Sequence, residues 1–396
     1  MKVNRTLGSS PTLTLTLAAL LYAFSIVLID IAPFFIGIYV DFHGLSLPQA
    51  GFVQTIDQAG GVIGAIFGFF LMPRTSWRQI LVVASLIATI ANAATAIADN
   101  YTFLLAVRFA SGFGVVLITT VTACVLAQSL APDRIFGAGL ALAMALSAVA
   151  VWLLDWLRES FGFAASLGSG AIWLGAGILV ALLLPKSLSG PTTGVGLDNS
   201  GLDSKSQQRT PAPGLIAIIA LGLFGVSVNV IYGFVERIGI ANGLEASGVA
   251  NALALGYVFS AVGSLVPTLF GAMGGRIKWI IVTTLLFIGS LYALFSADTV
   301  ALYTIAFAIY ASVWNMGLAY YMALIAENDP EHKYTRAMYI VNVAAQSAGP
   351  GIAALALTGA PLSVIFLIAP APALLALILV LLRRIGVEGH NQPGVV

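Results

Sequence analysis

The chain has 396 residues, of which 59% are hydrophobic and only 8% are charged. A soluble protein needs roughly 25% charged residues to cover its surface, so this composition excludes an ordinary soluble domain and indicates a membrane protein. The formal net charge of +1 excludes a general nucleic-acid-binding surface, and the single cysteine excludes a disulfide framework.

A membrane-spanning helix needs about 20 mainly apolar residues, and this length predicts twelve spans. The first apolar run, from about Leu13 to Val40, is too long for the core of a signal peptide, so we interpret it as a membrane helix. The predicted spans are 13–40, 48–72, 79–98, 101–129, 136–156, 165–185, 214–236, 247–271, 279–297, 300–325, 337–358 and 362–382. The sequence therefore predicts an all-α membrane protein.

A segment rich in Gly, Ser, Pro and Thr separates the sixth span from the seventh. We interpret residues 186–213 as a flexible linker. It divides the chain into a six-helix bundle over 1–185 and a second six-helix bundle, with a short tail, over 214–396. If the N-terminus is cytoplasmic, 14 of the 17 Lys and Arg residues fall in cytoplasmic segments. This asymmetry predicts that both termini are cytoplasmic.

The two halves of the chain carry scarce residues at the same spacing. The following pairs are each 202 positions apart: Gly61 and Gly263, Arg74 and Arg276, Trp77 and Trp279, and Arg134 and Arg336. Two pseudo-symmetric six-helix repeats predict a binding site between the halves, near the middle of the membrane.

This architecture resembles the major facilitator superfamily over residues 12 to 385, and a motif in the fourth span strengthens the resemblance. In LLAVRFASGFG, Leu104, Arg108, Gly112 and Gly114 have the spacing of the family's fourth-helix motif, although Ser111 replaces the usual glutamine. The resemblance implies a secondary transporter of the bacterial 12-helix type, and it implies that Arg108 takes part in proton coupling.

A second motif of the family lies in the loops that follow the second and eighth spans. GFFLMPRTSWR keeps Gly68, Arg74 and Arg78 but lacks the acidic residue of the pattern, and GAMGGRIKW keeps Gly271 and Arg276. The resemblance implies that these five residues belong to a cytoplasmic gate. The missing acid argues against the usual charge relay of that gate, and basic residues there also follow from topology alone.

Three charged residues lie deep inside predicted spans, where each costs roughly 2.5 to 3.5 kcal/mol to insert. Asp30 and Asp57 are about ten residues from the outer ends of spans 1 and 2, and Arg108 is about seven from that of span 4. Their depths agree to within roughly 5 Å at about 1.5 Å per residue. Arg108 can therefore compensate one carboxylate, and the other is left over.

A buried carboxylate without a full countercharge binds a proton more readily than one in water. We therefore expect Asp30 or Asp57 to carry the coupling proton, with Arg108 as the partner that one of them engages. The alternative is a permanent Asp–Arg ion pair that fixes helix packing and never changes its protonation.

Polar and aromatic side chains on other spans complete the predicted binding site. In the resembled family, helices 1, 4, 7 and 10 line the cavity, and span 11 adds two polar residues at i and i+4. The expected substrate-binding residues are Tyr22, Arg108, Asn229, Tyr232, Trp314, Asn315, Asn342 and Gln346. For the aromatic residues the alternative is lipid-facing packing, and for Asn229 and Asn315 it is a hydrogen bond between helices.

These features predict a proton-coupled secondary transporter in a bacterial cytoplasmic (inner) membrane. One arginine, few other charges and many aromatic residues favour a small amphipathic, aromatic or monoanionic solute, with sugars less favoured. Export of drugs or metabolites by proton antiport is the alternative, although the fifth-helix Gly-Pro motif of drug antiporters is absent from residues 137–152. A channel or a transport-derived sensor is a further class.

An enzyme is not expected, because the sequence lacks HExxH and GxSxG motifs and has no His–carboxylate cluster within the spans. The three histidines, His43, His332 and His390, fall in predicted loops or the tail, so neither a metal site nor a cofactor is expected. The expected partners are a small-molecule substrate, protons and the lipid bilayer, and the protein is expected to be a monomer that does not bind nucleic acid.

Overall fold

A computed structural model describes residues 11–72, 74–126, 132–185, 212–270, 273, 275–329 and 333–390. Within these ranges the chain is helical and contains no strand. The helices are α1 (Pro11–Asp30), α2 (Ala32–Asp41), α3 (Leu47–Leu71), α4 (Trp77–Thr95), α5 (Tyr101–Leu126), α6 (Pro132–Phe161), α7 (Phe163–Leu183), α8 (Ala212–Tyr232), α9 (Val235–Ala241), α10 (Ala246–Phe270), α11 (Arg276–Ser296), α12 (Val300–Glu327), α13 (Lys333–Ala356), α14 (Val364–Ile368) and α15 (Pro370–His390).

Ten of these helices are long and apolar enough to cross a membrane. The helices α3 and α13 are 25 and 24 residues long but carry more polar side chains. The first predicted span corresponds to α1 with α2, and the seventh to α8 with the start of α9. The all-helical membrane fold expected from the sequence is therefore confirmed. The linker expected at 186–213 lies, up to residue 211, outside the described residues.

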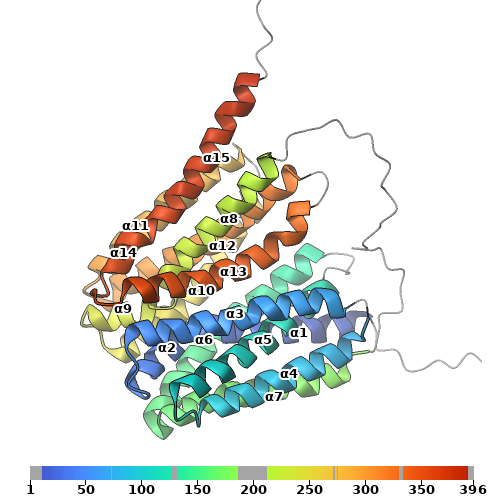
Figure 1. Ribbon diagram of the computed structural model, residues 1–396, viewed down its shortest axis with the longest axis vertical. Coiled ribbons are helices and arrows are strands. Elements are labelled where there is room, and N and C mark those ends of the chain that lie inside the picture. The colour runs from blue at the N-terminus through green and yellow to red at the C-terminus, as the bar shows by residue number, and fades with distance from the viewer. Residues whose placement is uncertain are drawn as a thin grey trace, which may run out of the picture.

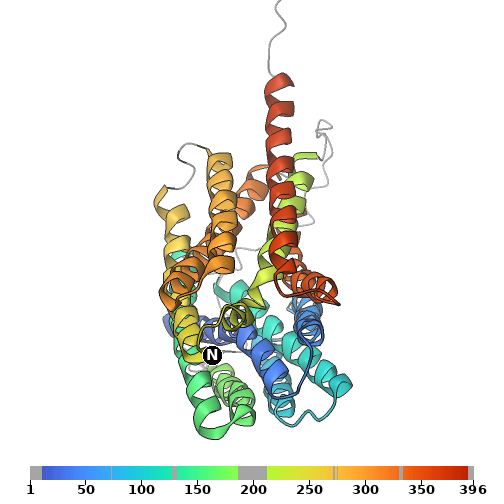
Figure 2. The same ribbon diagram turned by 90° about the vertical axis from the view of Figure 1, so that its left-hand side faces the viewer.

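The helices form two groups, α1–α7 and α8–α15 (Figure 1). Their axes converge where α2, α9 and α14 lie and diverge toward the opposite end (Figure 1). Figure 2 looks onto the convergent end, where α2 lies beside α9. We call this the α2–α9 end. Further along the helices, the two groups also pack through α3 against α13 and through α6 against α10.

Two helices that face each other across the groups are interrupted at similar places. Pro33 lacks a backbone N–H and stands at the start of α2, so the helical hydrogen bonds cannot continue from α1. The N–H of Phe34 donates to the carbonyl of Ile31, at 3.0 Å, instead of to that of Asp30. In the second group, α8 ends at Tyr232 and α9 begins at Val235. The first break leaves the Asp30 carbonyl available to groups outside its own helix.

Glycines set the closest helix contacts within each group. A Cβ on Gly60 would overlap the carbonyl of Phe109, and a Cβ on Gly112 would overlap the carbonyl of Asp57, so α3 and α5 touch backbone to backbone. In the second group, a Cβ on Gly263 of α10 would overlap the carbonyl of Ser312 of α12. The contact between α3 and α5 brings two of the predicted charged residues together.

Candidate functional site

Asp57 on α3 and Arg108 on α5 form a buried ion pair. Arg108 donates from Nη2 to Oδ2 of Asp57 at 2.8 Å, and the two side chains are 3% and 9% exposed. Nη1 of Arg108 donates to Oδ1 of Asn92 on α4 at 3.1 Å. The ring of Phe35 on α2 covers the guanidinium, with 5.1 Å between the ring centroid and the guanidinium carbon. Arg108 is thus held by groups from three other helices.

A small cavity borders this ion pair. It is about the size of one water molecule and is lined by apolar residues of α1 and α5 together with Gln58 and Ser111. Oδ1 of Asp57 is buried and lacks a hydrogen-bond partner among the described residues. A carboxylate oxygen next to a water-sized space is suited to accept a hydrogen bond from a bound water.

Asp30, the second predicted acid, is half-buried at the end of α1, and its carboxylate bonds a different group. The hydroxyl of Ser147 on α6 donates to Oδ2 of Asp30 at 2.7 Å. The ion pair of Arg108 is formed with Asp57 and not with Asp30. Among the described residues, the deep carboxylate left without an arginine is therefore that of Asp30.

The main-chain carbonyl of Asp30 is a meeting point of the two helix groups. Tyr232 on α8 donates its hydroxyl to this carbonyl oxygen at 2.8 Å, and Tyr257 on α10 donates to the same oxygen. The two tyrosine hydroxyls are 3.1 Å apart. The carbonyl can accept both bonds because the break before α2 removes its helical donor. Both tyrosines thus bind to the helix break of the opposite group.

Two predicted site residues on α12 contact the helices that carry these tyrosines. Trp314 on α12 packs edge-on against Tyr232, with 5.4 Å between ring centroids. Tyr22 lies two turns before Asp30 on α1 and is half-buried. The side-chain amide of Asn315 donates to the carbonyl of Ser260 on α10 at 3.2 Å, which is a bond between helices.

The remaining predicted binding residues lie on α8 and α13, which pack against each other. Asn229 is 4% exposed and donates to the carbonyl of Gly225 in its own helix at 2.8 Å. Its Cβ packs against Gly349, where any side chain would clash. Asn342 is 6% exposed, and Gln346 is half-buried one turn further along α13. Asn229 and Asn342 thus lie at the contact between α8 and α13.

The residues predicted for a cytoplasmic gate are spread over the divergent end. Gly68 packs near Thr120 of α5, Arg74 is exposed in the turn after α3, and Arg78 is half-buried in the first turn of α4. Arg276 pairs with Glu327 at 2.5 Å, within the second group. Gly271 lies outside the described residues.

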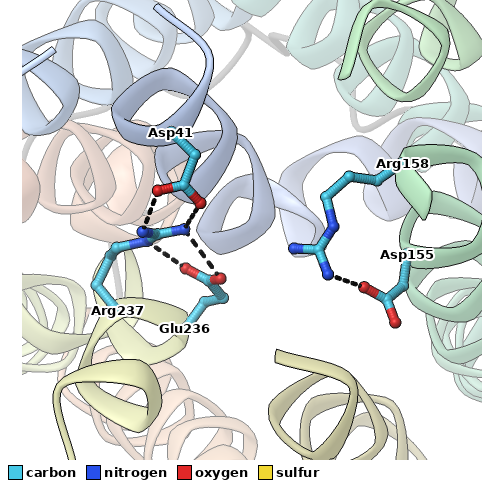
Figure 3. Close-up of polar contacts among 5 residues, drawn as sticks. All are labelled: Asp41, Asp155, Arg158, Glu236 and Arg237. Carbon is cyan, nitrogen blue, oxygen red and sulfur yellow. Dashed lines mark hydrogen bonds and ion pairs between the residues drawn. The ribbon is translucent and has the colours of Figure 1, made fainter. Parts of the chain in front are cut away.

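At the α2–α9 end, an ion-pair cluster joins the two groups (Figure 3). Arg237 on α9 donates to both carboxylate oxygens of Asp41 on α2, at 2.8 and 2.6 Å, and from Nε to Oε2 of Glu236 at 2.6 Å. Asp155 and Arg158 form a neighbouring pair on α6 (Figure 3). Glu236 is the last residue of the seventh predicted span and is only 3% exposed, because Arg237 and α2 cover it.

Sequence reasoning missed four residues of this site. Ser147, Tyr257, Asn92 and Phe35 contact Asp30 or Arg108, and the sequence gives no sign of this for Ser147, Tyr257 and Phe35. Only Asn92 carried a usable signal, since an amide in the middle of an apolar span predicts a polar partner. The other three depend on contacts between distant helices.

Comparison with known proteins agrees with this fold. The profile of the Major Facilitator Superfamily matches residues 15–354. No curated protein matches the chain. Among solved structures, a proton-dependent oligopeptide transporter is 15% identical with a TM-score of 0.71, and covers 95% of this chain and 99% of its own. A mutant of the nucleoside transporter NupG is 12% identical with a TM-score of 0.72, and the match covers 93% of this chain and 99% of that one.

A D-xylose–proton symporter is similar to the same degree. It is 17% identical with a TM-score of 0.72, and the match covers 93% of this chain and 96% of that one. At such identities the three structures show a common fold and nothing about the substrate. Together with the profile match over most of the chain, they show that this protein belongs to the Major Facilitator Superfamily of membrane transporters.

Proposed function

We propose that this chain is a proton-coupled secondary transporter that moves a small organic solute by alternating access, with Asp30 as the proton carrier. One observation carries the proposal: the carboxylate of Asp30 has no arginine partner in the described part of the chain, while the carbonyl of the same residue binds tyrosines of the opposite helix group. A change in the charge of Asp30 therefore acts directly at the contact between the two helix groups.

The coupling follows from the cost of a charge at this depth. An ionised Asp30 needs water or a cation nearby, and Ser147 supplies only one hydrogen bond to it. Protonation removes that need and favours the arrangement in which Tyr232 and Tyr257 close over the helix break. When the groups separate at the α2–α9 end, the carboxylate regains water and releases its proton.

Asp57 and Arg108 have a different role in this proposal. Asn92 and Phe35 also hold the guanidinium, which supports the alternative of a permanent ion pair. We assign to this pair the fixed packing of α3 against α5 and to Asp30 the change of protonation. The pairing of Arg108 with a monoanionic substrate is correspondingly disfavoured, since its charge is already balanced.

The membrane and the orientation are part of the same proposal. The charge asymmetry of the loops favours cytoplasmic termini in a bacterial inner membrane. The α2–α9 end then faces outward, and the structure corresponds to a state closed toward the outside. Two of the similar structures are described as proton-dependent or proton symporters, which supports proton coupling.

A reconstituted transport assay tests the proposal. Detergent-purified protein is first screened by thermal shift against nucleosides, short peptides, pentoses, aromatic acids and organic amines. The compound that stabilises most is then followed into proteoliposomes with an imposed pH gradient. We expect accumulation that a protonophore abolishes and that Asp30→Asn removes, whereas Asp298→Asn, at an exposed loop acid, retains it. Gradient-driven accumulation by Asp30→Asn would refute the proton role.

A further inference from the structure

We infer that the group around Asp30 is a binding site for an organic cation, which competes with the proton for the same carboxylate and is therefore exchanged for it. This inference rests on the proposed function and names the substrate class. It depends on the charge balance between the helices and on the chemistry of the groups around Asp30.

The charge balance leaves one negative site. Of the three charged residues placed deep in the spans, Asp57 and Arg108 cancel each other at 2.8 Å and are 9% and 3% exposed. Asp30 remains, and its carboxylate bonds a neutral hydroxyl. Deep in the described spans, a solute between the helix groups thus meets one carboxylate without a countercharge, which an anion avoids and a cation neutralises.

The groups near this charge are those that bind cations. The hydroxyls of Tyr232 and Tyr257 both donate to the carbonyl of Asp30, and Tyr22 lies two turns before Asp30 on α1. The indole of Trp314 packs on Tyr232, and Trp and Tyr rings attract cations through their π faces. Tyr232 and Trp314 are half-buried, so they keep surface that a ligand can cover.

Competition for one carboxylate fixes the stoichiometry of exchange. Asp30 holds either a proton or the cation, because binding of the cation requires the ionised carboxylate. Each bound cation therefore releases up to one proton, and by linkage a lower pH weakens cation binding. When the carboxylate is exposed to each side of the membrane in turn, this competition produces antiport of the cation against a proton.

The test uses three ligands that share a benzyl group and differ in charge. Calorimetric titration of detergent-purified protein compares benzyltrimethylammonium, a permanent cation, with neutral N-benzylacetamide and with the phenylmethanesulfonate anion. We expect only the cation to bind, with an affinity that rises up to about tenfold per pH unit as the pH increases. Proton release is read from the dependence of the heat on the ionisation enthalpy of the buffer.

Variants tie the binding to the carboxylate. Asp30→Asn should weaken benzyltrimethylammonium at least about tenfold and remove its pH dependence, while Asp298→Asn leaves both unchanged. Asp30→Glu retains the charge and should retain binding, which separates loss of charge from loss of fold. Equal binding of the neutral ligand, or an unchanged cation affinity in Asp30→Asn, overturns the inference.

The outcomes also separate this inference from the proposed function. Asp30-dependent cation binding without proton release keeps the cation site and refutes proton carriage by Asp30. Binding of an anion or a neutral ligand, with transport that both a protonophore and Asp30→Asn abolish, keeps proton carriage and refutes the cation site.

Discussion

The hydroxyl of Tyr232 donates to the carbonyl oxygen of Asp30 at 2.8 Å, and the two residues are 202 positions apart in the chain. The same offset separates Trp77 from Trp279. Asp30 is the last residue of α1 and Tyr232 is the last residue of α8, so the two helix breaks meet each other. One half of the chain supplies the acid at this position, and the other half supplies the hydroxyl that binds its backbone.

Loss of the tyrosine hydroxyls should open the α2–α9 end. Each bond to the Asp30 carbonyl is worth about 1 kcal/mol, so Tyr257→Phe or Tyr232→Phe should lower the ratio of closed to open molecules about fivefold. The double variant should lower it further. Opening can be measured as the distance between spin labels placed at Phe42 and Glu245, which are exposed just beyond α2 and α9. Cys124 is first replaced by Ser so that only these two positions are labelled.

The control for this experiment is Tyr292→Phe, because Tyr292 is 74% exposed on α11, away from the break. Its distance distribution should match that of the unmodified labelled protein. An unchanged distribution in the Tyr232→Phe, Tyr257→Phe double variant would show that these hydroxyls do not hold the two groups together.

The two membrane acids should respond differently to neutralisation. Asp57→Asn leaves Arg108 buried and unpaired, which costs about 3–5 kcal/mol, whereas Asp30→Asn removes an unpaired charge and should leave the protein equally or more stable. Melting temperatures in detergent distinguish the two. Asp57→Leu combined with Arg108→Met should recover most of the stability lost in Asp57→Asn. A similar loss in both Asn variants would contradict the assignment of the ion pair to Asp57.

The sequence predicts the helices well because span length and hydropathy are local properties. The deep positions of Asp30, Asp57 and Arg108 also follow from counting residues inward from span ends. Which of the two acids pairs with Arg108 does not follow from the sequence, since it depends on how closely the helices approach one another. Gly60 and Gly112 allow α3 to pack closely against α5, and this contact places Arg108 within ion-pair distance of Asp57.

The environment of Glu236 shows the same limit at a helix end. An acid followed by an arginine at the boundary of a span is usually solvated, and the sequence gives no reason to expect otherwise. In the fold, α2 of the other group covers it and supplies Asp41 as a second partner for Arg237. The burial of Glu236 thus depends on a contact between two helices that are distant in the sequence.

Glycine substitutions should separate helix contacts from lipid-facing surface. Gly112→Ala places a methyl group on the Asp57 carbonyl, so α3 and α5 must move apart and the nearby ion pair must lengthen. A Cβ added at Gly289 on α11 would meet open space, and Gly289→Ala should stabilise its helix by up to about 1 kcal/mol. We expect a lower melting temperature for Gly112→Ala and an equal or higher one for Gly289→Ala. Equal stability of the two variants would mean that α3 and α5 do not touch at Gly112.

The ion-pair cluster at the α2–α9 end should respond unequally to loss of its members. The Asp41 side chain is 39% exposed, so Asp41→Asn should change the free-energy difference between the closed and open states by only about 0–1 kcal/mol. Arg237→Gln leaves the buried Glu236 without its countercharge, and opening relieves this by exposing Glu236 to water. The Phe42 and Glu245 labels should then report a longer distance.

Two further variants identify the cause of that opening. Arg237→Lys keeps a positive charge and should stay closer to the parent than Arg237→Gln does. Glu236→Gln combined with Arg237→Gln removes the unpaired charge and should return the distance toward its original value. If the single Arg237→Gln variant remains as closed as the parent, Glu236 does not depend on Arg237, and the closed end is held by the tyrosines and the apolar packing of α2 on α9.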